Sequence, residues 1–158
     1  MLKRVFCLFI TALMLFSLSG CANILGGAVF LFLAASANDS ADKDKIAEFV
    51  CENEAELLQA IEKGDFSAFE NKGFIKDVDA SKKVVDFPCG GAGIGSGTSY
   101  VGFYYTPDHN MTAVWCAPSS DSALTASGEG YEWREPKGDN RYYTEHICGN
   151  FYYYEASF

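Results

Sequence analysis

Apolar and polar positions follow two different periods along this chain, and the change between them falls near residue 74. Between residues 44 and 64, apolar side chains recur at the spacing of one helical face. Asn53 interrupts this stripe, and Asn53-Glu54-Ala55-Glu56 has the pattern of a capping box, in which the Asn53 side chain caps a helix and Glu56 returns the bond. The pattern therefore predicts one bent helix or two short helices, ending at Gly64 as the C-cap. The apolar positions are Ile46, Phe49, Val50, Leu57, Ala60 and Ile61.

After residue 74 the pattern changes to the alternation that is typical of β-strands. We expect Pro88 to stop the first strand, residues 89–97 to form a glycine loop, and two hairpins to turn at residues 107–110 and 136–139. Helices followed by a series of strands indicate an α+β fold, with an N-terminal helix or helix pair packed on an antiparallel sheet of about five strands. The expected strands are residues 82–87, 99–106, 111–116, 130–135, 140–148 and 151–157.

Aromatic residues fall on both faces of the last two predicted strands, whereas a half-solvated sheet alternates apolar with polar residues. One face can pack on the helices, and the other needs cover from residues near Phe30, a long loop, a partner or a ligand. Tyrosine suits interfaces because its large apolar ring carries a polar tip. The alternative is that tyrosines are good strand residues whose hydroxyls reach water. The candidate binding residues on the second face are Tyr142, His146, Tyr152 and Tyr154.

The N-terminus carries an export signal. Lys3 and Arg4 precede an uncharged apolar run over residues 5–18, which ends in Leu18-Ser19-Gly20-Cys21. These four residues resemble the lipobox of bacterial lipoproteins. The resemblance implies that Cys21 becomes the first mature residue and carries acyl chains that anchor the protein in the membrane. No aspartate follows Cys21, so the family's sorting rule implies the outer membrane of the cell envelope, facing the periplasm.

Residues 24–37 depart from the lipoprotein pattern because they are apolar where a polar tether is usual. Three interpretations remain open: a lipidated Cys21 followed by a segment on the membrane or on the domain, cleavage after Ala35-Ser36-Ala37, or an uncleaved helix over residues 5–37 that is long enough to span a bilayer. All three export the rest of the chain. We expect a signal peptide over 1–20, a tether over 21–43, and a single α+β domain over 44–158.

The net charge argues against one class of partner, and the cysteine content indicates disulfides. The chain has a formal charge of −9, and loss of Lys3 and Arg4 with the signal makes the mature part more acidic, which argues against nucleic acid as a partner. An even number of cysteines in a small exported domain indicates two disulfides, for which we expect the pairs Cys51–Cys89 and Cys116–Cys148. The cysteines beyond the lipobox are Cys51, Cys89, Cys116 and Cys148.

Motifs for catalysis are weak. Residues 89–97 lack the lysine of a phosphate-binding loop, and only His109 and His146 are available to activate a thiol or bind a metal. We therefore expect no catalytic residue, no cofactor and no metal. Acidic residues that a sugar-cleaving enzyme needs in pairs are plentiful, for example Glu129, Glu132, Glu135 and Glu145.

The function predicted from the sequence is a membrane-anchored envelope lipoprotein that acts as a non-catalytic binding module for a protein or an envelope ligand. One variant is an inhibitor or immunity protein against a toxin or a host lysozyme, because a basic enzyme is complementary to an acidic blocker. The alternative from a different class is a cell-wall-modifying enzyme that uses acidic residues.

Overall fold

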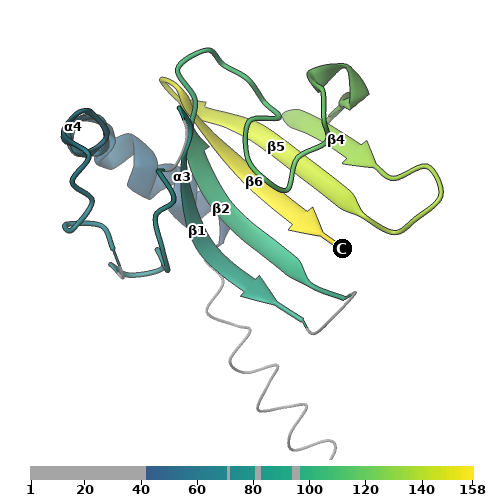
Figure 1. Ribbon diagram of the computed structural model, residues 1–158, viewed down its shortest axis with the longest axis horizontal. Coiled ribbons are helices and arrows are strands. Elements are labelled where there is room, and N and C mark those ends of the chain that lie inside the picture. The colour runs from purple at the N-terminus through teal and green to yellow at the C-terminus, as the bar shows by residue number, and fades with distance from the viewer. Residues whose placement is uncertain (1–41, 71, 81–82, 94–96) are drawn as a thin grey trace, which may run out of the picture. The chain divides into compact units, whose positions relative to one another are not determined.

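The structure is a computed structural model that describes residues 42–158 apart from 71, 81–82 and 94–96. The chain divides into residues 1–38 and 39–158, and the described residues belong to the second unit. Cys21 and the apolar segment 24–37 lie outside the described residues. Two α-helices precede a six-stranded antiparallel sheet in this part of the chain, which confirms the α+β class and corrects the expected strand number (Figure 1). The elements are α3 (Lys43–Glu52), α4 (Glu54–Lys63), β1 (Val85–Ala92), β2 (Ser99–Tyr105), the 3-10 turn η1 (Asp121–Ala123), β3 (Thr125–Ser127), β4 (Gly130–Arg134), β5 (Arg141–Cys148) and β6 (Phe151–Ser157).

The helical stretch is two short helices that meet at Asn53. The Asn53 side chain donates a hydrogen bond from Nδ2 to the Phe49 carbonyl oxygen at 2.8 Å, so it closes α3. No side-chain hydrogen bond from Asn53 caps α4, and the predicted capping box with Glu56 is therefore wrong. The predicted C-cap is confirmed, because Gly64 has a left-handed φ of 65° and its N–H bonds the last turn of α4.

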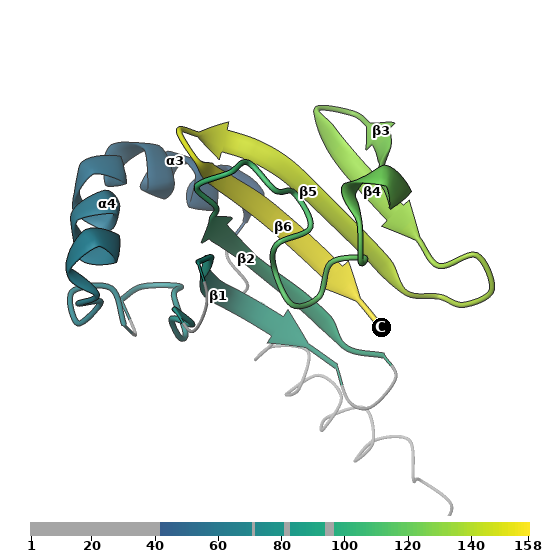
Figure 2. The same cartoon turned by 45° about the horizontal axis from the view of Figure 1, so that its top comes forward.

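The strand order across the sheet is β1-β2-β6-β5-β4-β3. The hairpin of β4 and β5 is confirmed, and β6 has the expected bounds. The other predicted hairpin is wrong, because residues 111–116 form no strand. Both edges of β2 are occupied instead, one by β1 and the other by β6. Residues 106–124 therefore cross over the sheet as a loop that contains η1 (Figure 2).

Strand β1 continues through Pro88, which corrects the expectation that this proline ends the strand. β1 is the first strand in the sheet order, and its register with β2 shifts between Pro88 and Gly90. Proline is tolerated on edge strands and at bulges because the missing N–H breaks little of the ladder there. The Pro88 carbonyl still accepts a hydrogen bond from the Lys76 N–H at 2.8 Å.

The sheet has two differently covered faces. We call the face that bears Phe103 and Tyr153 the helix face, because α3 packs there against β5 and β6. We call the face that bears Tyr104 and Tyr142 the loop face, because residues 106–124 cover it. Figure 1 shows this loop in front of the strands while α3 and α4 lie at one end of the sheet. None of the helices among the described residues is long and apolar enough to cross a membrane.

Candidate functional site

The predicted aromatic binding surface lies on the loop face and is not available to a partner. Tyr142 and Tyr154 are each 1% exposed and Tyr152 is 7% exposed, because residues 106–124 pack over their rings. The long loop thus provides the cover that the sequence called for on the second sheet face. His146 is exposed, and its ring lies 5.2 Å from the ring of Tyr152. The expectation that these four residues form one contact surface is corrected by this burial.

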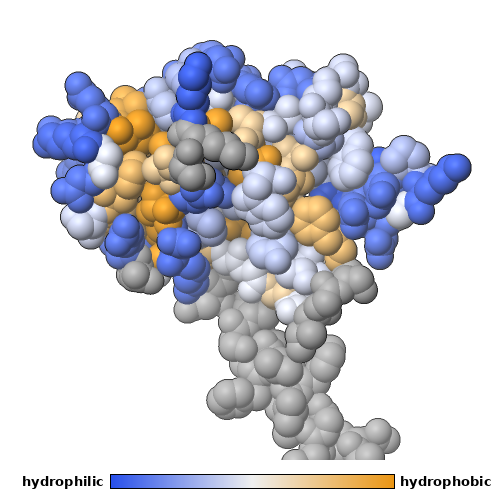
Figure 3. Space-filling model, in the orientation of Figure 1, coloured by the Kyte–Doolittle hydropathy of each residue, from blue (hydrophilic) through white to orange (hydrophobic). Residues whose placement is uncertain are grey.

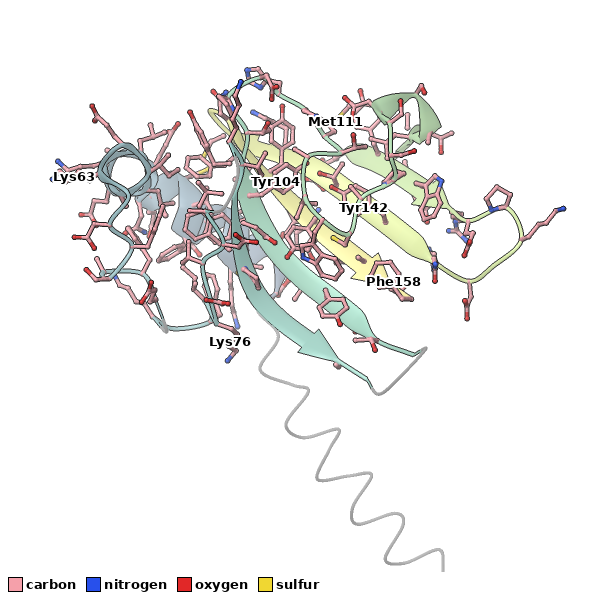
Figure 4. The ribbon with its side chains drawn as sticks, in the orientation of Figure 1. Lys63, Lys76, Tyr104, Met111, Tyr142 and Phe158 are labelled. Atoms are coloured by element: carbon pink, nitrogen blue, oxygen red, sulfur yellow. The ribbon has the colours of Figure 1, made fainter. Side chains whose placement is uncertain are left out.

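The tyrosine hydroxyls on the loop face bind the loop itself. Tyr104 and Tyr142 donate hydrogen bonds to the carbonyl oxygen of Met111 at 3.0 and 2.9 Å, and Figure 4 shows both rings beneath the segment that carries Met111. Burial raises the pKa of Tyr104 to about 12, so its hydroxyl stays protonated and donates. These tyrosines therefore have a structural role, with their polar tips satisfied inside the protein.

An open cavity of about 470 Å³ lies where the helices leave the helix face uncovered; we call it the pocket. Its volume is in the range of small-molecule sites. The start of α3 contributes Asp42 and Lys43 to one wall, and the strands contribute the floor. Charged and tyrosine side chains therefore meet on a surface that is otherwise the continuation of a core face. The floor includes Val101, Glu132, Arg141, Tyr143, Tyr153 and Glu155.

Strand register brings the pocket residues together. Val101, Glu155, Tyr143 and Glu132 are direct cross-strand neighbours in one row over β2, β6, β5 and β4. Direct neighbours on one face have Cβ atoms about 5 Å apart, so their side chains share one site. Three residues of this row, Glu155, Tyr143 and Glu132, carry polar groups. This explains why this part of the face can remain open to water.

On one side of the pocket, the negative charge of Glu132 is balanced by two arginine side chains. Glu132 Oε1 lies 2.9 Å from Arg141 Nη2 and 2.8 Å from Arg134 Nε. The hydrogen bond from Arg141 is the main reason that the pKa of Glu132 lies below its ordinary value. Glu132 is therefore ionised at neutral pH, with its charge balanced by two guanidinium groups.

The start of α3 supplies a second ion pair beside the pocket. Lys43 Nζ donates to Glu145 Oε2 at 2.9 Å, and the Tyr143 hydroxyl donates to the same oxygen at 2.5 Å. Burial alone would raise the pKa of Glu145, but the hydrogen bonds from Tyr143 and Lys43 outweigh it and hold the pKa below its usual value. The bond to Glu145 in turn raises the pKa of Lys43.

Glu155 differs from these two acids because it has no ion-pair partner among the described residues. The Tyr153 hydroxyl donates to Glu155 Oε1 at 2.5 Å, and the side chain is exposed in the pocket. One carboxylate oxygen is thus oriented by a tyrosine, on a side chain that is exposed to solvent. Such a group can accept a hydrogen bond from a cationic ligand without losing an internal partner.

The candidate residues Tyr143, Tyr153 and Glu155 were missed by sequence reasoning, although a signal for them exists. Tyr143-Thr144-Glu145 and Tyr153-Tyr154-Glu155 share the pattern Tyr-x-Glu on adjacent strands. Residues two apart in a strand lie on the same face, so each tyrosine can donate to its own glutamate. Two copies of this pattern indicate a polar patch within an otherwise apolar face.

Exposed apolar surface is concentrated elsewhere. Trp115 in the loop is 57% exposed, and its ring packs 5.1 Å from Tyr100 and 6.0 Å from Phe158. Figure 3, which views the molecule as Figure 1 does, shows apolar surface mainly at the helical end and hydrophilic residues around the β4–β5 turn. The exposed Trp115 ring on the loop face therefore belongs to one cluster with Tyr100 and Phe158, and Trp115 itself lies outside the pocket on the helix face.

The expected disulfide pairs are contradicted by the structure. All four cysteines of these pairs are unbonded, and Cys116 lies in the core of the loop face whereas Cys148 packs against the core of the helix face. Cys51 instead lies near Cys148, with their side chains 2.9 Å apart and no bond between them. No group of three or more His, Cys, Asp or Glu side chains that could hold a metal occurs within the part of the chain that the structure describes.

Comparisons of the chain with family models, with curated proteins and with solved structures found no match. The site must therefore be interpreted from its own geometry.

Proposed function

We propose that this protein is a lipid-anchored envelope protein that binds a basic protein partner through the pocket on the helix face. The observation that carries the proposal is Glu155, a carboxylate acceptor held by Tyr153 without a cation of its own among the described residues. A lysine or arginine side chain of the partner would supply that cation. The formal charge of −9 favours the approach of a basic protein by long-range attraction. An inhibitor or immunity protein against a toxin or a lysozyme has this character.

Binding measurements with the full chain in detergent test the proposal. The probes are a basic lysozyme and an acidic protein of similar size, each passed over immobilised protein at low and high salt. We expect the lysozyme alone to bind, and Glu155→Gln to weaken its binding about tenfold, the equivalent of one charge-assisted hydrogen bond. Glu70→Gln is the matched control, because Glu70 is an exposed glutamate outside the pocket.

The proposal fails if the lysozyme does not bind, or if Glu70→Gln weakens binding as much as Glu155→Gln. Loss of binding in Trp115→Ala alone would place the contact on the exposed ring of the loop and would also refute the pocket. We expect the binding to weaken in high salt. Dissolved ions screen the attraction between exposed charges that lie more than about 10 Å apart at an ionic strength of about 0.1 M, and this distance shortens as salt is added.

A wall-modifying enzyme remains the alternative, and the electrostatics of the pocket support it less. A glycosidase needs one carboxyl that stays protonated near neutral pH to act as the general acid. The pKa values of Glu132 and Glu145 are both lowered by their hydrogen bonds, so both side chains are ionised. Release of soluble fragments from purified cell wall, abolished by Glu132→Gln or Glu145→Gln, would favour the enzyme and overturn the binding module.

The envelope location rests on the resemblance of residues 18–21 to a lipobox. We expect the wild-type chain to incorporate labelled palmitate and to sediment with membranes. Cys21→Ala should lose both properties, since three acyl chains anchor far more firmly than one. Retention of the variant in membranes would indicate that an uncleaved helix anchors the chain, and a wild-type chain without label would refute lipidation.

Export also bears on the disulfides. An oxidising compartment allows cysteines to pair, and small exported domains use disulfides to compensate for small cores. We propose that the domain is stapled by a disulfide, although not by the two pairs that the sequence suggested.

A further inference from the structure

Two cysteines far apart in the sequence are brought together at one end of α3. Cys51 lies in the last turn of this helix and Cys148 is the last residue of β5, and their side chains are 2.9 Å apart. Cys51 is exposed and Cys148 is partly buried, so an external oxidant can reach the pair. Disulfide bonds require such proximity before oxidation, because two cysteines that point apart cannot be bridged without backbone movement.

The surrounding contacts hold the pair in place from both sides. At the other end of α3, Lys43 binds Glu145 of β5 at 2.9 Å, so the helix is tied to the same strand at its start. Next to the cysteines, Gly149 has a left-handed φ of 52°, and a Cβ atom there would collide with the Glu54 carboxylate. The turn after β5 therefore fits closely against the junction of the two helices, and the nearness of Cys51 and Cys148 is a property of the packed fold.

The remaining cysteines have no such arrangement. Cys89 is completely buried beneath the helices, and Cys116 is 5% exposed on the opposite face of the sheet. Burial raises the pKa of Cys116 to about 12 and also raises the pKa of Cys89, so both side chains remain protonated thiols. Neither is accessible to a disulfide oxidant.

We propose that Cys51 and Cys148 form a disulfide that fastens α3 to the end of β5, while Cys89 and Cys116 stay as buried thiols. The proposal rests on the proposed export, which supplies the oxidant, a disulfide-bearing thiol oxidoreductase or oxidised glutathione. It replaces the two expected pairs with one pair and assigns a separate role, core packing, to the other two cysteines.

The chemistry balances with that oxidant. The exposed Cys51 thiolate attacks one sulfur of the oxidant's disulfide, forming a mixed disulfide and expelling the other sulfur as a thiolate. The Cys148 thiolate then attacks the Cys51 sulfur and expels the oxidant's second thiolate. Cys51 and Cys148 together lose two electrons and two protons, and the oxidant's disulfide is reduced to two thiols. Cys51 is exposed whereas Cys148 is partly buried, which assigns the first attack to Cys51 and the second to Cys148.

Oxidation of the purified, reduced full chain in a glutathione redox mixture tests the pairing without any need for export. Free thiols are then alkylated in denaturant, and peptides are mapped by mass spectrometry without reduction. We expect a linked peptide pair that contains Cys51 and Cys148, about 2 Da lighter than the sum of its reduced peptides because two protons and two electrons have left. Cys89 and Cys116 should be alkylated in the denatured sample.

Matched variants make the test specific. Cys51→Ser and Cys148→Ser should each abolish the link, whereas Cys89→Ser and Cys116→Ser should retain it. Reduction of the wild type should lower its urea midpoint to that of Cys51→Ser and should leave the midpoint of Cys51→Ser unchanged. A link through Cys89 or Cys116, or no link at glutathione potentials, would overturn the proposal.

The same mapping on protein whose thiols are trapped in intact cells separates the pairing from the export. If the link forms in the purified protein but both cysteines are reduced in cells, the pairing holds and the envelope location is refuted. If the link is absent from the purified protein, the pairing is refuted whatever the location of the chain.

Discussion

Asp86 should make the stability of this protein fall as the pH rises. The side chain is 5% exposed, and neither carboxylate oxygen has a hydrogen-bond partner among the described residues. The Tyr154 hydroxyl lies close enough to favour the ionised form in part, but without the geometry of a full hydrogen bond. Burial, with smaller contributions from the negative charges of Asp79 and Asp77, raises the pKa of Asp86 to about 7.

The size of the effect follows from the two pKa values. Asp86 is protonated in the folded and unfolded states below its ordinary pKa of 3.8, and ionised in both above about 7. Between these limits only the folded state keeps the proton, so the free energy of unfolding falls by about 1.4 kcal/mol per pH unit. The total loss is about 4 kcal/mol, and the part between about pH 5 and pH 8 is about 2.5 kcal/mol. This loss is a large share of the stability of a small domain.

Asp86→Asn removes the charge and keeps the shape, so its difference from the wild type isolates this contribution. Urea unfolding of both proteins at about pH 5 and pH 8 should show the variant gaining about 2.5 kcal/mol relative to the wild type over that interval. If the introduced amide lacks hydrogen-bond partners, it changes the free energy of unfolding by the same amount at both pH values. The pH dependence is therefore unaffected. The control is Asp108→Asn, because Asp108 is exposed and its bond to Thr106 lowers its pKa, which places its titration below this interval. A difference that stays constant with pH would show that Asp86 ionises normally, and the reasoning from burial would then be wrong.

Four further substitutions test the packing. Phe103→Ala should lower the free energy of unfolding by about 3–5 kcal/mol in urea, because the ring is completely buried. Gly64→Ala should lower it by about 1 kcal/mol because its φ of 65° is left-handed, whereas Gly97→Ala has open space and should be close to neutral in the same urea titrations. Lys43→Ala should cost less than about 1 kcal/mol by double-mutant cycle with Glu145, because the lysine side chain is 36% exposed and water screens the pair.

Elements with a clear local signal were predictable from the sequence. β6 is a run of aromatic residues, which favour strands, directly after the turn at Gly149-Asn150, and its predicted bounds match the structure. The end of α4 at Gly64 was equally clear, because a glycine can adopt the left-handed cap that other residues resist. In both cases the local residues decide the conformation without help from distant parts of the chain.

Two errors have one common cause, the neighbour that a segment acquires in the fold. Pro88 ends a strand only where its N–H would be needed, and the edge position of β1 with its bulge removes much of that need. Residues 111–116 alternate well enough for a strand, but β6 occupies the strand edge they would have used. Such competition for an edge depends on contacts between distant segments, which local patterns do not report.

The pocket could not be predicted from the sequence, for a related reason. Lys43 and Glu145 are 102 residues apart in the chain, and Glu132 meets Tyr143 only through the register of β4 with β5. Each acidic residue, taken alone in the sequence, is indistinguishable from an ordinary solvent-exposed residue. Only the Tyr-x-Glu pattern on β5 and β6 connects them in the sequence, and its meaning depends on the two strands being adjacent.

The aromatic richness of the sheet has different meanings on its two faces. A loop that crosses a sheet brings its own carbonyl groups into an apolar environment, where each unpaired group is costly. Tyr104 and Tyr142 solve this problem by donating to Met111 from beneath, which a phenylalanine could not do. On the helix face, Tyr143 donates to Glu145, which Lys43 also binds, and Tyr153 donates to Glu155, which is exposed to solvent. The hydroxyls on the loop face are therefore used by the fold, whereas the Tyr153 hydroxyl orients an exposed acceptor, and this difference is why we place the partner site in the pocket.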